Sequence, residues 1–117
     1  MEIPKPIRER RRSIRINEHL PFNIGGHGYE IQAVTQNISV NGAMCLVEKD
    51  IPMMTQLDVA LSLSESSRVQ KIRMKGVVVR KEVDPETGHF SIAIYFSTLQ
   101  PQDKIKLEKF IERRLNS

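Results

Sequence analysis

The sequence predicts an all-β domain with a C-terminal helix: a small six-stranded antiparallel β-barrel, capped by one α-helix and preceded by a flexible basic N-terminal arm. Three observations indicate this class. Between residues 19 and 98, apolar residues recur at every second position in short runs, which is typical of strands with one buried face. After residue 98 the apolar spacing becomes helical, and before residue 16 the chain is rich in arginine.

The length of 117 residues is that of one domain. Hydrophobic residues make up 39% of the chain and charged residues 27%, which is enough apolar material for a core and argues against a disordered chain. We expect a basic arm over residues 1–15, which Pro4 and Pro6 begin as extended backbone, and a single barrel domain over residues 16–117.

Four groups of residues share a strand face: Tyr29, Ile31 and Ala33; Leu57, Val59, Leu61 and Leu63; Ile72, Met74, Gly76 and Val78; and Phe90, Ile92, Ile94 and Phe96. Glycines at 25, 26 and 28 supply a tight connection before the first group, and the Asp-Pro-Glu-Thr-Gly segment at 84–88 predicts a turn before the last. Gly76 is a candidate for a bulge or for a point of close approach. A closed barrel lets so short a chain avoid exposed sheet edges.

A helix is predicted over about residues 101–115. Pro101 suits a first helical position, Asp103 suits the positive end of the helix dipole, and two arginines at 113 and 114 suit the negative end. The apolar residues at helical spacing are Leu107, Phe110, Ile111 and Leu115.

The net charge of +4 is confined to the arm. Residues 1–15 carry six basic and two acidic side chains, whereas the other 102 residues carry twelve of each sign. This distribution indicates a local anionic partner for the arm rather than a generally basic surface.

The candidates for catalysis or metal binding are few. His19, His27 and His89 are scattered without a second ligand at metal spacing, and Cys45 lies in the apolar run at 43–47, where a packed strand residue is expected. No GxSxG, GxxxxGK[ST] or GxGxxG motif is present. We therefore expect no enzymatic activity, no cofactor and no metal. A single cysteine and the lack of an export signal or of a long apolar run indicate a cytoplasmic protein without a membrane span.

Two polar segments stand out. The first runs from Arg10 to Arg15, where Arg11 and Arg15 form an RxxxR pattern of planar donors suited to phosphate or to the guanine O6/N7 edge. The second, residues 37–42, offers the short polar groups of Asn37 and Ser39 on one side of extended backbone, while Gly42 permits a positive-φ turn or close approach of a ligand. Taken alone, the first segment is better explained as a solvated basic tail, and the second as an ordinary Asn-Gly hairpin turn.

Together the two segments resemble the PilZ domain family of bacterial cyclic di-GMP receptors. An RxxxR arm is followed about twenty residues later by [DN]xSxxG, residues 76–80 match the GxVxR strand of the family, and residues 92–96 match its last barrel strand. Asn replaces the more common Asp at position 37, and residues 93–96 read Ala-Ile-Tyr-Phe where Gly-Val-x-Phe is frequent.

The resemblance implies a ligand and a set of residues that bind it. Arg11 and Arg15 would hold phosphate and guanine, Asn37 and Ser39 would bond the ligand from the barrel, and Gly42 would shape their loop. In the family, an arginine directly before the pattern, here Arg10, tends to accompany binding of two stacked ligands, although Arg10 can also be one more solvated charge of the arm. Arg80 is a further candidate, although an outward strand arginine can equally be a solvated surface residue.

We therefore expect a non-enzymatic cyclic di-GMP receptor or adaptor that orders its arm on ligand binding and signals to a partner protein, as a monomer or a dimer. One alternative is a nucleic-acid or anionic-surface binder that uses the basic arm, against which the neutral body and the lack of aromatic residues in the arm argue. Another is a PilZ-like interaction domain that binds no nucleotide, against which the intact motifs argue.

Overall fold

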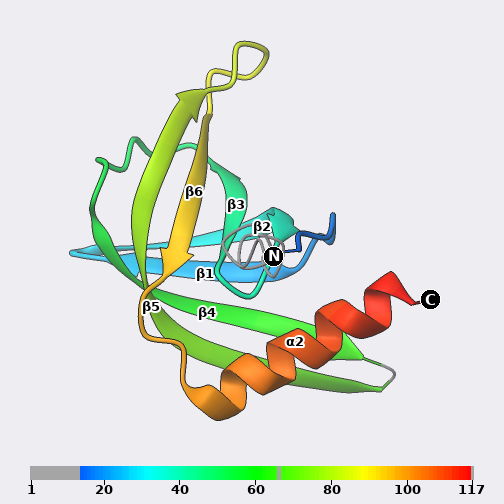
Figure 1. Cartoon of the computed structure of the whole chain (residues 1–117). Helices are drawn as coiled ribbons and strands as arrows, with labels where there is room; N and C mark the ends of the chain where they lie inside the picture. Colours follow the sequence, from blue (N-terminus) through cyan, green and yellow to red (C-terminus); the bar gives the residue numbers. More distant parts are fainter. Residues whose placement is uncertain (1–13, 66, 117) are drawn as a thin grey trace, which may run out of the picture.

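The computed structural model describes residues 14–65 and 67–116, which form a closed antiparallel barrel followed by one helix (Figure 1). The elements are β1 (Pro21–Gly26), β2 (Tyr29–Ile38), β3 (Gly42–Val47), β4 (Gln56–Glu65), β5 (Arg68–Val83), β6 (Phe90–Phe96) and α2 (Pro101–Leu115). Around the barrel the strands follow the order β1-β2-β3-β6-β5-β4. The predicted six-stranded antiparallel barrel with a C-terminal helix is confirmed.

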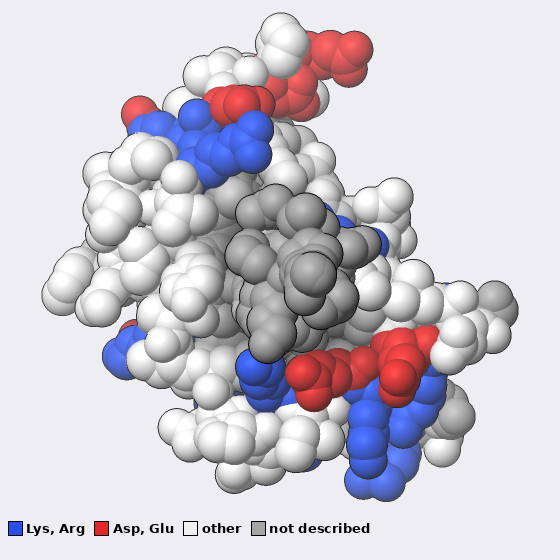
Figure 2. Space-filling model, viewed as in Figure 1, with Lys and Arg blue, Asp and Glu red and all other residues white. Residues whose placement is uncertain are grey.

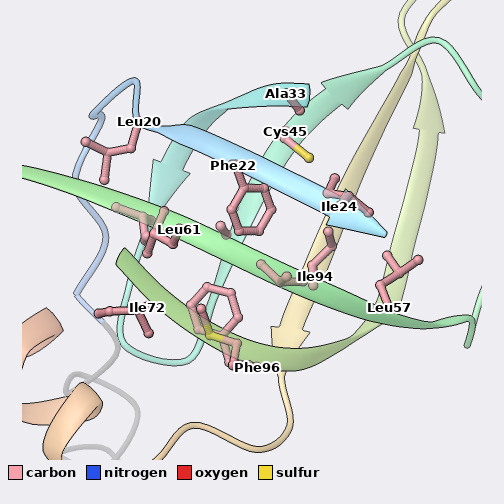
Figure 3. Close-up of a cluster of buried hydrophobic side chains, with 14 of the residues drawn as sticks. Leu20, Phe22, Ile24, Ala33, Cys45, Leu57, Leu61, Ile72, Ile94 and Phe96 are labelled. Atoms are coloured by element: carbon pink, nitrogen blue, oxygen red, sulfur yellow. The ribbon is translucent and has the colours of Figure 1, made fainter. Parts of the chain in front are cut away.

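The interior of the barrel is built from the alternating residues of the strands. Phe22 and Ile24 of β1, Leu57 and Leu61 of β4, and Ile94 of β6 are fully or almost fully buried. Figure 3 shows these side chains pointing toward one another from different strands. Because side chains alternate across a strand, burial of these residues directs the intervening ones to the outer face. That outer face carries the candidate site.

The longest strand, β5, pairs with two neighbouring strands. Its first half pairs with β4 and its second half with β6, and Gly76 is opposite both Leu57 and Phe96. A Cβ at position 76 would lie 2.5 Å from Cγ2 of Ile94, so glycine is needed for close packing there. The predicted close approach at Gly76 is confirmed, whereas the bulge lies further along, between Val78 and Arg80. The expectation that all six strands are short is wrong for this 16-residue strand.

The helix α2 runs alongside β4 (Figure 1) and adds Leu107, Phe110 and Ile111 to the same hydrophobic cluster as the barrel interior. Arg113 of its last turn pairs with Glu65 at 2.5 Å, which links the helix to the end of β4. Leu115 continues the helical spacing of these residues, but its side chain is 51% exposed.

The segment before β1 is attached to the end of β2. Ile16 and Ile38 exchange two backbone hydrogen bonds of 2.9 Å, and the Leu20 N–H donates to Oγ1 of the buried Thr35 at 2.9 Å. Glu18 pairs with Arg114 of α2 at 3.2 Å. This segment therefore holds Arg15, which lies within it, in a defined place between the barrel and the helix.

Candidate functional site

Two residues that are 22 positions apart in the sequence meet at the end of β2. The guanidinium Nη1 of Arg15 donates a hydrogen bond to Oδ1 of Asn37 at 3.0 Å, at the surface of the protein. The bridge between Ile16 and Ile38, one residue further along each segment, brings the two backbones together. The structure thus joins one residue from each of the two polar segments in one place.

A row of outward positions extends from Asn37 across the barrel. The strand register places Asn37 opposite Met44, Met44 opposite Ala93, and Ala93 opposite Arg80. Adjacent strands are about 4.8 Å apart, so the row spans roughly 14 Å over β2, β3, β6 and β5. Arg80 therefore shares the outer face with Asn37 but lies three strands away from it.

Arg80 itself is exposed and lies 3.6 Å from the carboxylate of Glu82. Both side chains are about two-thirds exposed, so water screens this ion pair and holds the guanidinium only weakly. An anionic ligand on the barrel face could displace Glu82 at little cost.

Ser39 differs from the arrangement expected from the sequence. Ser39 is fully buried, whereas Asn37 is half-buried, so the two side chains do not form a shared polar surface. The hydroxyl oxygen of Ser39 accepts a hydrogen bond from the Asn41 N–H at 3.1 Å, and its backbone N–H donates to the Gly42 carbonyl at 2.9 Å. The hydroxyl thus closes the turn between β2 and β3.

Replacing Ser39 by alanine should therefore destabilise the fold. The change removes the hydrogen bond that the hydroxyl accepts from the Asn41 N–H, and we expect the free energy of unfolding to fall by about 0.5–1.5 kcal/mol, the usual worth of one hydrogen bond. Urea denaturation measures this value. An unchanged midpoint would show that the hydroxyl does not hold the turn, and Ser91→Ala, which removes another hydroxyl from a half-buried strand position, is the matched control.

Gly42 lacks one of the two properties that the sequence allowed for it, the positive φ, and is needed for close packing instead. Positive φ occurs among the described residues only at Met54, Gly28 and Gly88, so the positive-φ turn expected at Gly42 is wrong. A Cβ at position 42 would lie 2.3 Å from the carbonyl oxygen of Ile94 in β6. Glycine at this position lets β3 and β6 pair beside the turn, which positions the middle of the outward row.

Arg10 and Arg11 lie outside the described residues, so their roles remain predictions. Cys45 is fully buried in β3, and its burial raises the pKa of the thiol to about 12, which keeps it a protonated core residue at neutral pH. Within residues 14–65 and 67–116, no group of histidine, cysteine and acidic side chains is arranged to hold a metal ion.

Sequence reasoning missed Met44 and Ala93, which form the middle of the outward row. The alternation of their strands already directs both side chains outward, since Ala43, Cys45, Ile92 and Ile94 are buried. Their place beside Asn37 and Arg80 depends on the register between strands that are distant in the sequence. The register in turn depends on a bulge in β2, between Thr35 and Asn37. No motif in the sequence predicts this bulge.

The comparison with protein families identifies the class of protein. The model of the PilZ domain matches residues 9–113, so the chain belongs to the PilZ domain family. This confirms the resemblance that the two polar segments indicated. No curated protein sequence matches the chain. In the described part of the chain, no helix combines the length and the hydropathy that a membrane crossing requires.

Solved structures share the fold. The Bacillus subtilis inhibitor of motility (MotI/DgrA) is similar with a TM-score of 0.81 and 23% identity, over 91% of this chain and 52% of that chain. The K. pneumonia MrkH–c-di-GMP complex gives a TM-score of 0.71 and 17% identity, over 89% and 52%. The PilZ domain of YcgR from Escherichia coli with c-di-GMP gives 0.61 and 17%, over 91% and 94%. The chain spans about half the length of the first two proteins.

Proposed function

We propose that this protein is a non-enzymatic receptor for cyclic di-GMP. The observation that carries the proposal is the bond between Arg15 and Asn37, which joins the RxxxR arm to the [DN]xSxxG turn within a chain of the PilZ family. Two of the similar structures are of PilZ-like chains in complex with c-di-GMP, which supports the same ligand here.

The chemistry of the ligand suits these residues. Cyclic di-GMP presents two phosphates and two guanines, and guanidinium groups offer paired donors to both phosphate oxygens and the guanine O6/N7 edge. Arg15 would turn from Asn37 toward the ligand, with Arg11 as its neighbour in the arm. The amide of Asn37 would then bond the ligand from the barrel, and Gly42 would keep the turn beside it in shape.

Ser39 and Arg80 have different parts in this proposal. Ser39 acts on the ligand through the turn that its hydroxyl closes, and a direct contact would require the turn to open. Arg80, at the far end of the outward row, would meet a ligand that extends across β3 and β6.

Ligand binding would order the arm, because clustered arginines repel one another until an anion neutralises them. The ordered arm would then present a changed surface to a downstream protein partner in the cytoplasm. Hydrogen exchange over residues 5–16, with and without saturating ligand, tests this ordering.

Calorimetric titration of the purified chain with cyclic di-GMP tests the receptor assignment. GTP and a short DNA duplex are the controls, because each offers phosphate and guanine without the cyclic dinucleotide shape. Saturable binding of cyclic di-GMP alone supports the proposal. Preferred binding of DNA would support a basic clamp instead, and no binding of any of the three would support a PilZ-like interaction domain.

The Arg10→Leu variant is expected to change the number of ligands bound. An extra guanidinium before the RxxxR pattern can stack on an exposed guanine of a second ligand molecule. We expect calorimetry to give about two ligands per chain for the unchanged protein and about one for the variant, since Arg11 and Arg15 still bind the first with charge-assisted bonds. A ratio of one in the unchanged protein would contradict this prediction and leave the receptor assignment standing.

A further inference from the structure

An apolar groove of about 450 Å³ lies between α2 and the segment that leads into the barrel. Ile14 and Val40 form one side, and Ile105, Ile111 and Leu115 of α2 form the other. Ile14 is 50% exposed, and Ile105 and Leu115 are each 51% exposed. The groove is therefore an open apolar surface.

The groove has an acidic edge. Glu108 and Glu112 of α2 line it, are exposed, and have no ion-pair partner among residues 14–65 and 67–116, while Lys109 beside them offsets part of their charge. Figure 2 shows acidic side chains gathered over the C-terminal half of α2. A segment that fits this groove would combine apolar residues with neighbouring positive charge.

We propose that residues 3–7 of this same chain occupy the groove when no ligand is bound, so that the part of the arm ordered by the ligand is the arginine segment at residues 8–15. Their sequence is Ile-Pro-Lys-Pro-Ile, which is the most apolar part of the arm and contributes nothing to the ligand site proposed above. The next five residues contain four arginines and one glutamate, which complement the edge formed by Glu108 and Glu112.

The dimensions allow this docking. From Ile105 to Leu115 the helix rises about 15 Å, and an extended segment of five residues with two prolines spans about 12 Å. The described chain begins with Ile14, which itself lines the groove, so the arm starts at its rim. Ile7 and Ile14 are seven residue steps apart, so the chain between them can extend up to about 24 Å, which is enough for the arm to turn back along α2. Pro4 and Pro6 restrict the free segment, so docking orders few additional dihedral angles.

The docked arm would compete with the ligand. Ile14 faces the groove, whereas the next residue, Arg15, bonds to Asn37 on the barrel. The chain before Ile14 can thus continue along α2 or across the barrel face, where Arg11 would meet the ligand. This step rests on the proposed function. If docking is favoured several-fold in the free protein, the apparent ligand affinity is lowered by the same factor.

Photocrosslinking of the full chain tests the docking itself. Lys109→p-benzoylphenylalanine places the crosslinker at the edge of the groove, on an exposed side chain without an ion-pair partner in the described region. We expect crosslinks to residues 3–7 of the same molecule, and their loss with saturating cyclic di-GMP. Mixing isotope-labelled and unlabelled chains separates links within one chain from links between two. Links to a second copy, no link to residues 3–7, or links that persist with bound ligand would overturn the proposal.

Affinity measurements give an independent test. Ile7→Ser and Ile105→Ser should each tighten cyclic di-GMP binding about three- to tenfold, because the competing state is lost. Val83→Ser is the matched control: Val83 is a 61% exposed apolar residue at the β5–β6 end of the barrel, far from α2 (Figure 1), and its loss should leave affinity unchanged. Unchanged or weaker binding in both isoleucine variants would overturn the competition. If the chain binds no cyclic di-GMP at all, the proposed function fails, while the crosslink in the free chain still decides the docking.

Discussion

Replacing Arg15 by alanine is expected to weaken cyclic di-GMP binding roughly ten- to a hundredfold and to leave the fold intact. A charge-assisted hydrogen bond contributes about 1.5–3 kcal/mol, and every 1.4 kcal/mol is about tenfold in affinity. Arg15 is exposed, and its hydrogen bond with Asn37 is at the surface. Its removal should therefore change the free energy of unfolding by less than about 0.5 kcal/mol.

Calorimetric titration and urea denaturation of the same sample separate the two effects. Arg73→Ala is the matched control, because Arg73 is an exposed arginine of β5 that pairs with β4 through Ala60, away from the row that begins at Asn37. Both variants lose one positive charge, so a purely electrostatic attraction would weaken them equally. Equal affinities for the two variants, or unfolding of Arg15→Ala, would contradict the site.

The Arg11→Ala variant should behave like Arg15→Ala if the RxxxR pair acts as the resemblance implies. Because Arg11 lies outside the described residues, this comparison is the direct test of its role. Normal cyclic di-GMP binding by Arg11→Ala would show that Arg11 does not hold the ligand, and the ligand site would then rest on Arg15 and Asn37.

The fold could be predicted from the sequence because its determinants are local. Alternation in β4 and β6 fixes which residues are buried, and the change to helical spacing after Thr98 marks α2. The exposure of Leu115 could not be predicted in this way. It continues the helical spacing, but nothing in the described chain covers the last turn on that side, and this depends on where the barrel ends beneath the helix.

The candidate site could be predicted less completely, because its geometry depends on distant pairings. The two motifs contain Arg15 and Asn37, but the contact between these residues depends on the bridge between Ile16 and Ile38. Burial of Ser39 depends on the turn that its own hydroxyl closes. The residue type alone shows only that a hydroxyl is present, and not that the turn uses it. The pattern thus named candidate residues and the chemistry that they offer, whereas their orientation required the strand register.

Gly42→Val is expected to cause the largest loss of stability among the residues of the candidate site. A Cβ at this position would lie 2.3 Å from the Ile94 carbonyl oxygen and 3.3 Å from its carbonyl carbon. Both are backbone atoms, so the clash cannot be relieved by moving a side chain, and β3 and β6 would have to separate. The Gly42 carbonyl that accepts the Ser39 N–H would move with them.

We expect Gly42→Val to lower the free energy of unfolding by at least about 2 kcal/mol, since overpacking a well-packed region typically costs 1–3 kcal/mol and here the neighbour is backbone. For a domain of this size the melting temperature should fall by roughly 8 °C or more. Gly42→Ala carries the same Cβ and should show most of the effect. Gly25→Ala in β1 is the control, because its Cβ would meet only ordinary contacts of 3.7 and 3.8 Å to Asp58. If Gly42→Ala and Gly25→Ala had the same melting temperature, β6 would not approach β3 as closely as the structure shows, and the turn after β2 would owe its shape to something other than this glycine.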